Sequence, residues 1–308
     1  MSKKRKLHSV WKRIWPLYVM MLPGIIYIVI NNYLPMFGII IAFKRIDYAK
    51  GIFASDWVGF DNFKFLFATK DAYIITRNTI LYNLAFIILG TIAGVAVAIL
   101  LNEVVSTFWK KTYQTLLLLP QLISMVIVSY IGYAFLNADN GFLNNTILPF
   151  FGIEPISWYS EPKYWPFILI ITNLWKGLGY GSIVYFSAIL GIDRSLYEAA
   201  AIDGAKRIQQ IWLITLPLLK TTIILMVLMS VGNIFRSDFG LFYQLPLNSG
   251  ALYSTTNTID TYVYRSLMQL NNIAMSSAAG VYQSIVGFVV IVIVNAIVRK
   301  IDSESALY

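Results

Sequence analysis

Long apolar runs dominate the chain and give the first structural prediction. A helix that crosses a bilayer needs about 20 mostly apolar residues, because each residue rises about 1.5 Å. Six stretches reach that length without the alternation of apolar and polar positions that is typical of strands. They cover residues 16–43, 78–101, 113–137, 164–190, 218–236 and 276–298. We therefore predict an all-α integral membrane protein with six transmembrane helices.

The first span is expected to be an uncleaved helix. A basic tail, residues 1–15, precedes it in the manner of a secretory signal. The apolar stretch is longer than a signal h-region, and no small-residue cleavage site follows it. Pro23 and Pro35 mark expected kinks in this span.

Two segments between the spans are expected to fold outside the membrane. Residues 44–77 mix aromatic with turn residues, as in Trp57-Val58-Gly59-Phe60-Asp61-Asn62-Phe63, and predict a small extracytoplasmic cap. Residues 138–163 carry turn signals such as Asn140-Gly141 and Glu154-Pro155. Neither segment is long enough for a catalytic domain.

Composition narrows the function. The chain is 58% hydrophobic and 13% charged, whereas soluble domains average roughly 45–50% and about 25%, so a soluble enzyme core is excluded. Without cysteine there is no disulfide framework, thiol catalysis or zinc–thiolate site. The single histidine, His8, lies in the basic tail, away from any partner for a metal site or a Ser-His triad.

The distribution of charge predicts an orientation. The segments expected inside the cell are 1–15, 102–112, 191–217 with Lys220, and the tail 299–308. The segments expected outside are 44–77, 138–163 and 237–275 with Arg236. The inside set holds 14 Lys/Arg and six acids, and the outside set nine of each. The positive-inside rule then places both termini in the cytoplasm, although the six basic residues of 44–77 count against it. The net charge of +9 reflects topology and lipid contact, and no nucleic acid is needed as a partner.

The inside loop 191–217 has strong local signals. Asp193 is a good N-cap, residues 196–201 favour a helix, and Gly204 can take a positive φ and end it. A second helix is expected to follow, with one apolar face, before Pro217 starts the next span. That face holds Ile208, Ile211, Trp212, Thr215 and Leu216. The loop is either a plain connection between spans or a small helix-turn-helix that docks on another protein.

The same loop carries a specific motif. Glu198-Ala199-Ala200, then Asp203-Gly204-Ala205, then a hydrophobic run that closes in Leu216-Pro217 resembles the EAA loop of binding-protein-dependent ABC importers. Other stretches are similar to the oligosaccharide permease group called LplB-like. They are 57–63, Leu119-Pro120, 193–204 and Thr258-Ile259-Asp260-Thr261-Tyr262-Val263-Tyr264-Arg265.

The resemblance implies a fold, partners and a docking site. The fold is the type I ABC importer permease with six transmembrane helices, in the bacterial inner membrane. The partners are a second homologous permease, two cytoplasmic ATPase subunits and an extracytoplasmic solute-binding protein. The residues implied to couple to the ATPase are Glu198, Ala199, Ala200, Asp203, Gly204 and Ala205. ATP and Mg would be bound by the ATPase, because this chain has no Gly-x-x-x-x-Gly-Lys-Ser/Thr motif and needs no cofactor of its own.

The transport pathway is predicted from polar residues inside spans, which are costly there and usually face the bundle interior. Asn173, Lys176, Gly177 and Tyr180 share one helical face, and Asn233 and Ser237 are expected to share a face of the next span. These residues either contact a sugar or hydrogen-bond neighbouring helices. For Asn83, Gln121 and Gln283 the same two roles are open, with the structural one favoured for both glutamines.

Lys176 is the one charge well inside a span. In the structural role its ammonium reaches backbone carbonyls, an acid such as Asp238 or an acid on the partner permease. In the other role it meets the carboxylate of an acidic sugar such as a uronate.

These observations predict the permease subunit of an ATP-driven importer of oligosaccharides. The alternative cargoes for the same machine are glycerol phosphate and a peptide. An ion-coupled secondary transporter would need acids inside the spans, which hold none. A membrane enzyme would need catalytic His, Cys or paired carboxylates, which the spans also lack.

Overall fold

The computed structural model describes residues 2–301, and this part of the chain is almost entirely helical. Its α-helices are α1 (Ser2–Ile28), α2 (Leu34–Met36), α3 (Gly51–Ala54), α4 (Asp61–Ala68), α5 (Lys70–Glu103), α6 (Thr107–Leu122), α7 (Met125–Leu136), α8 (Leu148–Phe150), α9 (Trp165–Leu190), α10 (Arg194–Ile202), α11 (Arg207–Gln210), α12 (Leu216–Val231), α13 (Tyr253–Thr256), α14 (Ile259–Met268) and α15 (Ile273–Ile301). Two short strands, β1 (Lys44–Arg45) and β2 (Asp56–Trp57), pair antiparallel. Short 3₁₀ turns cover Phe37–Phe43, Trp158–Ser160, Pro162–Tyr164 and Gly250–Leu252.

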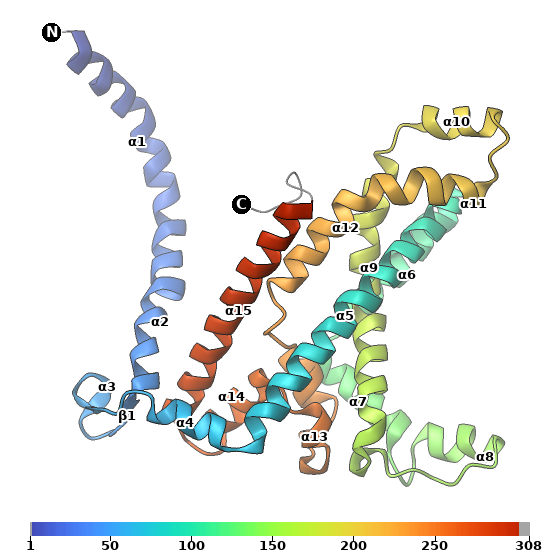
Figure 1. Ribbon diagram of the computed structural model, residues 1–308. Helices are drawn as coiled ribbons and strands as arrows, with labels where there is room; N and C mark the ends of the chain where they lie inside the picture. The colour runs from blue at the N-terminus through green and yellow to red at the C-terminus, as the bar shows by residue number, and fades with distance from the viewer. Residues whose placement is uncertain (1, 302–308) are drawn as a thin grey trace.

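The prediction of six membrane spans is confirmed in outline. Within residues 2–301, five helical stretches are long and apolar enough to cross a bilayer, and the bent pair α6–α7 makes a sixth if it counts as one span. The five are Ile14–Phe43, Lys70–Glu103, Pro162–Leu190, Arg207–Val231 and Ile273–Lys300. The start of α1 and the end of α15 lie at the same end of the molecule as α10, while α4, α8, α13 and α14 lie at the other end (Figure 1).

The third predicted span, 113–137, is wrong as a single straight helix. The axes of α6 and α7 differ by 93°, and the bend falls at residues 123–124. Both residues of the bend have extended backbone, and the Ser124 hydroxyl then accepts a hydrogen bond from the N–H of Ile127 to start α7. The α6 carbonyls freed at this bend are bonded by a side chain from α9, described below.

The fifth predicted span, 218–236, ends too late. α12 stops at Val231, and residues 232–235 form a turn. At Gly232 a Cβ atom would come within 2.9 Å of the Ile291 side chain on α15, so the close approach of α15 favours glycine at this point. Asn233 and Ser237 therefore do not share a helical face, contrary to the sequence-based expectation.

Helices run across three predicted boundaries at the α10 end. α1 begins at Ser2, so residues 2–15 of the expected tail continue directly into the first span as helix. Pro217 does not restart the chain, because residues 207–231 form one continuous helical stretch. The expected tail 299–308 is helical to Ile301, and the rest of it lies outside the described residues.

Prolines explain a recurrent irregularity. Four π-helical turns each end two residues before a proline. The turns are Val29–Tyr33, Leu143–Ile147, Ile211–Thr215 and Gly240–Gln244, before Pro35, Pro149, Pro217 and Pro246. A proline ring clashes with the carbonyl four residues earlier, and a widened turn relieves that clash. The kink predicted at Pro35 falls at such a turn, whereas Pro23 stays inside α1.

The core is arranged along α5, which contributes to all three buried clusters. One cluster joins the start of α5 to α14 and α15 through residues such as Ile75, Ile259 and Met275. The second lies around Trp165 and Phe242, and the third joins the far end of α5 to α9 and α12 through Ala98 and Leu219. At Gly179 on α9 a Cβ atom would overlap the carbonyl of Leu117 on α6, so these two backbones touch there.

The predicted cap is present but small. Lys44 pairs with Trp57 and Arg45 with Asp56 between the two strands. The buried Lys44 donates to the carbonyls of Ile52 and Phe53, and Asn62 donates to the carbonyls of Ala42 and Lys44. α5 begins at Lys70, so the cap proper ends before the residue 77 expected from the sequence.

Candidate functional site

α10 is fixed at both ends by bonds within its own loop. The carboxylate of Asp193 accepts a hydrogen bond from the N–H of Ser195 at 2.9 Å, and this bond holds the pKa of the carboxyl below its usual range. At the other end Gly204 has φ of +81°, the N–H of Ala205 donates to the carbonyl of Ala200, and the N–H of Gly204 donates to that of Ala201. This Schellman arrangement needs a left-handed residue, and glycine takes that conformation without strain.

Three contacts hold α10 and the segment that follows it, residues 203–215, in place. The hydroxyls of Tyr197 and Thr215 lie 2.9 Å apart in a hydrogen bond. The buried amide of Gln210 donates to the carbonyl of Ala205. Arg207 forms an ion pair with Glu103 at the end of α5, with 3.5 Å between nitrogen and oxygen. The predicted helix-turn-helix is therefore braced on the transmembrane helices.

Residues 198–205, the α10 tip, are open to solvent. Glu198, Ala199, Asp203 and Gly204 are exposed, while Ala200 and Ala205 are half-buried. Ile202 at the end of the helix is 87% exposed. Within residues 2–301 neither Glu198 nor Asp203 forms an ion pair. The tip thus presents small and apolar groups beside two carboxylates, a surface that suits a partner with basic residues.

The predicted pathway residues of α9 are separated in the structure. Asn173 and Gly177 line a cavity of about 190 Å³, together with Thr91 of α5 and Ser230 of α12. Tyr180, one helical turn further on, is 66% exposed and lies outside the lining of that cavity.

Lys176 is held by backbone carbonyls. Its ammonium donates to the carbonyl of Ile123 at 2.5 Å, to that of Gln121 at 3.2 Å and to that of Pro120 at 3.4 Å. These carbonyls are at the end of α6, where the helix carries the negative end of its dipole. The Pro120 carbonyl also accepts from the N–H of Ile123, whereas the last carbonyls of a helix have no partner within it. Within the described residues Lys176 forms no ion pair. Of its two predicted roles, these contacts match the structural one.

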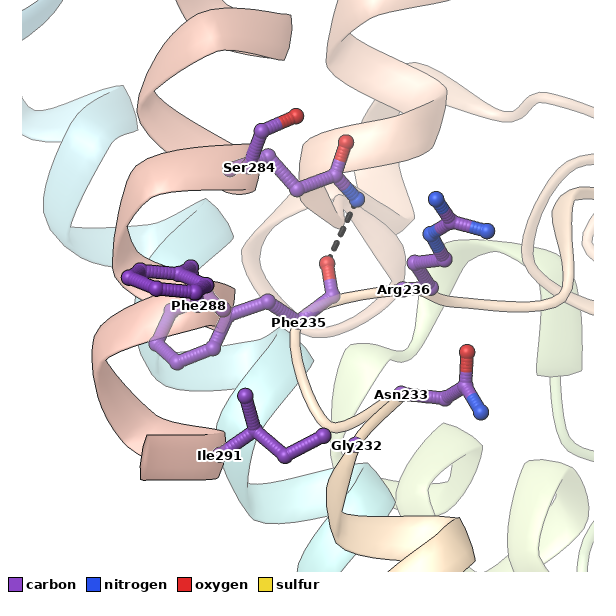
Figure 2. A pocket seen from close by; sticks show the side chains of 9 residues that line it. Gly232, Asn233, Phe235, Arg236, Ser284, Phe288 and Ile291 are labelled. Atoms are coloured by element: carbon purple, nitrogen blue, oxygen red, sulfur yellow. Dashed lines mark hydrogen bonds between the residues drawn. The ribbon is translucent and has the colours of Figure 1, made fainter. Parts of the chain in front are cut away.

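A second, more polar cavity follows α12. It has a volume of about 310 Å³ and lies between the turn at 232–236 and α15. Figure 2 shows Asn233 and Arg236 extending to the same side of this turn, away from Phe288 and Ile291. The cavity also includes Gln283 and Ser284 of α15. Of the predicted pair Asn233 and Ser237, only Asn233 lines this cavity.

Ser237 belongs to a hydrogen-bonded network instead. A carboxylate oxygen of Asp260, on α14, accepts bonds from the Ser237 N–H at 2.6 Å and from the Ser237 hydroxyl at 2.8 Å. The amide of Gln283 donates to both Asp260 oxygens and to the carbonyl of Phe235. Asn83 on α5 donates to the carbonyl of Arg236. For Gln283 and Asn83 these contacts match the structural role.

Two residues of this region, Arg236 and Asp260, were not identified as site residues from the sequence. Arg236 was counted with an outside loop, and Asp260 was noted only within a family motif. The sequence feature that could have identified Arg236 is its position, three residues after Asn233 at the end of an apolar run. For Asp260 the bonds that matter reach residues 23 positions away on either side, which no local pattern shows.

Comparison with known proteins gives a consistent result. Residues 87–303 match the protein family described as "Binding-protein-dependent transport system inner membrane component". The chain is 34% identical to protein LplB of Bacillus subtilis (strain 168), covering 94% of this chain and 90% of that protein. It is 35% identical to the polygalacturonan/rhamnogalacturonan transport system permease protein YteP of the same strain, covering 94% and 89%.

Solved structures agree with these sequence matches. A chain of a bacterial ABC transporter involved in the import of the acidic polysaccharide alginate superposes with a TM-score of 0.87 at 34% identity, covering 96% of this chain and 99% of that one. A chain of a bacterial alginate ABC transporter in complex with an alginate pentasaccharide-bound periplasmic protein gives a TM-score of 0.86, covering 96% and 98%.

Proposed function

This chain belongs to the family of binding-protein-dependent transport system inner membrane components, and on that premise we propose that it is the permease subunit of an ATP-driven importer of acidic oligosaccharides. The observation that carries the proposal is the similarity, over nearly the whole chain, to permeases named for polygalacturonan, rhamnogalacturonan and alginate. Amides and hydroxyls in both cavities support a sugar cargo, because such groups can pair with sugar hydroxyls.

The α10 tip is the proposed docking site for the ATPase. Glu198, Ala199, Ala200, Asp203, Gly204 and Ala205 would enter a groove of that subunit, which binds ATP and Mg. The exposed tip and the rigid helix ends support this role, since a rigid element can transmit closure of the ATPases to the transmembrane helices. The braces at Thr215 and Glu103 lead from the tip into α12 and α5.

The proposed assembly has four further components: a second homologous permease, two ATPases and a solute-binding protein. α1 stands apart from the bundle formed by α5, α9, α12 and α15 (Figure 1), and its large side chains are exposed along its length from Trp15. A second permease beside α1 would cover this surface. The α10 end would face the cytoplasm with both termini, and the α14 end would face the solute-binding protein.

The proposed pathway passes the two cavities. Asn173 and Gly177 line the first and Asn233 the second, and Ser230 and Gly232, two residues apart, connect their linings along the chain. Lys176 and Ser237 position backbone around this pathway, and the exposed ring of Tyr180 is available to a sugar or to the second permease.

Reconstitution tests this function directly. The four proposed components and this chain would be placed in proteoliposomes, and uptake of labelled uronate oligosaccharides would be followed with and without ATP. We expect uptake only when the ATPases, ATP and the loaded solute-binding protein are all present. Uptake driven by a proton or sodium gradient without ATP would instead favour a secondary transporter.

A second measurement tests whether ATP is bound only by the ATPase subunits. Purified chain alone is expected neither to bind nor to hydrolyse ATP, because its sequence has no phosphate-binding loop. Saturable nucleotide binding to the isolated chain would contradict the proposal that the ATPase holds the nucleotide.

A further inference from the structure

The cavity after α12 lies midway along a membrane span. Gly287 in its wall is the central residue of α15, Ile273–Ile301, and Ser284 and Phe288 are its neighbours within one turn. Arg236 therefore belongs to the wall of a polar cavity beside the middle of the last membrane span. A charge at that depth is costly unless it meets water, an opposite charge or a ligand.

No acid of the described chain neutralises Arg236. Within residues 2–301 its guanidinium forms no ion pair and donates no hydrogen bond, and its side chain is exposed. The acids of the turn and of the Ser237 network accept hydrogen bonds from other groups. Asp238 accepts from the N–H of Leu241, and Asp260 accepts from Ser237 and Gln283.

The backbone of Arg236 is fixed while its side chain is free. Its carbonyl accepts a bond from Asn83, and its N–H donates to the carbonyl of Asn233 at 2.8 Å. The next residue, Ser237, is held by Asp260. A guanidinium on such an anchored turn is pre-positioned, so little freedom is lost when it binds an anion.

The other cationic side chain near the middle of a span, Lys176, already has hydrogen-bond partners. Lys176 has three carbonyl partners and lies outside the lining of this cavity. A carboxylate that bound Lys176 would have to displace the bonds that close the end of α6. Arg236 can accept a carboxylate without breaking any contact of the described chain.

The geometry points to Arg236 as the residue that binds the carboxylate of an acidic sugar unit during its passage through the membrane. This inference rests on the proposed import of oligosaccharides and assigns their charge preference to one side chain. The planar guanidinium matches a carboxylate with two parallel N–H···O bonds. The Asn233 side-chain oxygen, which lies on the same side of the turn, is placed to accept a bond from a hydroxyl of the same sugar unit (Figure 2).

The test compares charged and neutral cargo in the full complex. Uptake of a uronate pentasaccharide and of its carboxyl-reduced counterpart would be measured for wild type, Arg236→Gln, Arg236→Lys and the control Lys176→Met. Binding of both sugars to the complex without solute-binding protein would separate the membrane site from the delivery step. Correct assembly of each variant would be checked by its co-purification with the ATPases.

We expect Arg236→Gln to lower uronate uptake and binding about ten-fold or more, as for loss of a charged hydrogen bond, with a smaller loss for the neutral sugar. Arg236→Lys should recover part of the loss, and added salt should weaken uronate binding more in wild type than in Arg236→Gln. Lys176→Met should affect both sugars equally.

Three results would overturn the assignment: equal losses of both sugars in Arg236→Gln, no loss of either, or a charge-selective loss in Lys176→Met instead. A wild-type complex that carries the neutral sugar but not the uronate would also overturn it and leave oligosaccharide import standing. A wild-type complex that carries neither sugar would overturn the proposed function itself.

Discussion

The α10 loop and the opposite end of the bundle are held together by different kinds of contact. Within the loop the capping and bracing hydrogen bonds join residues at most 18 positions apart, as between Tyr197 and Thr215, and the one longer contact is the partly exposed ion pair of Arg207 with Glu103. At the α14 end the side chain of Asn78 donates to the carbonyl of Asn257, and the N–H of Ile259 donates to Thr79, across 179 and 180 positions. Buried Arg265 adds bonds to Asn257 and Asn248.

This difference suggests that the α10 loop serves to bind a partner and that the α14 end serves to stabilise the bundle. The local bonds of the loop fix its backbone and leave the outer face of the tip open. The long-range bonds of the α14 end join the start of α5 to the segment before α15, so these distant parts of the chain hold each other in place. Changes in the loop should therefore affect coupling more than stability, and changes at the α14 end the reverse.

The largest expected effect is on coupling. Gly204→Val forces a β-branched residue to φ of +81°, and Glu198→Lys reverses a charge on the same tip. We expect both variants to insert normally and to lose ATP-driven uptake in proteoliposomes. Within residues 2–301 no atom lies within 4 Å of a Cβ at Gly204, so backbone strain is the direct effect of the valine on this subunit.

Gly152 provides a matched control for that experiment. It also has a positive φ, +68°, with open space around its Cβ position, but it lies in the segment between α8 and α9. Gly152→Val should keep ATP-driven uptake. If it removes uptake as completely as Gly204→Val, the loss reflects strain in general and says nothing about docking.

The next largest effect is expected on stability, at a buried side chain between α7 and α8. Asn144 is 1% exposed, donates to the carbonyls of Ala138 and Ile156, and accepts from the N–H of Ile156 and the indole of Trp158. Asn144→Ala leaves these groups unsatisfied, each at a cost of about 1–3 kcal/mol. A clear fall in the melting temperature of the purified complex is expected. The adjacent, exposed Asn145→Ala should change it far less.

A smaller loss of stability is expected for Asp260→Ala. It removes the acceptor for Ser237 and Gln283, and a hydrogen bond to a charged group contributes about 1.5–3 kcal/mol. Asp56→Ala is the control, because its ion pair with Lys50 is exposed and such pairs contribute about 0–1 kcal/mol. Equal melting temperatures for the two variants would show that the Asp260 network does not hold the α12 turn.

The smallest effect concerns the cap of α10. Asp193→Ala should speed hydrogen exchange at the first turn of α10, while Asp193→Asn, which still caps, should not. The bond from Ser195 lowers the pKa of Asp193, so its contribution is complete at neutral pH and is lost only as the pH falls through that lowered value. Exchange that stays equal in wild type and Asp193→Ala would contradict the capping role.

The local features of the α10 loop were predictable from the sequence. Asp193 and Gly204 act within one helical turn, so their residue types alone specify the cap and the turn. The six apolar runs were likewise sufficient to identify the spans, because span length follows from bilayer thickness. The docking role of the tip stays a prediction.

The interior of the bundle was not predictable in the same way. The end of α12 depends on the approach of α15 at Gly232, and the role of Lys176 depends on where α6 bends. Asn233 and Ser237 are four positions apart, as on one helical face, but the chain leaves the helix before them. These outcomes are set by contacts between distant segments, which hydrophobic periodicity does not specify.

The contact of Lys176 with the end of α6 also has a consequence for how the protein is made. The carbonyls of Pro120, Gln121 and Ile123 are synthesised 53 to 56 residues before the lysine that bonds them. The Pro120 carbonyl also accepts from the N–H of Ile123, but within residues 2–301 no backbone N–H donates to the carbonyls of Gln121 and Ile123, and an unsatisfied carbonyl is costly in lipid. The α6–α7 segment should therefore remain beside the translocon until α9 emerges and enter the bilayer together with it, as a pair.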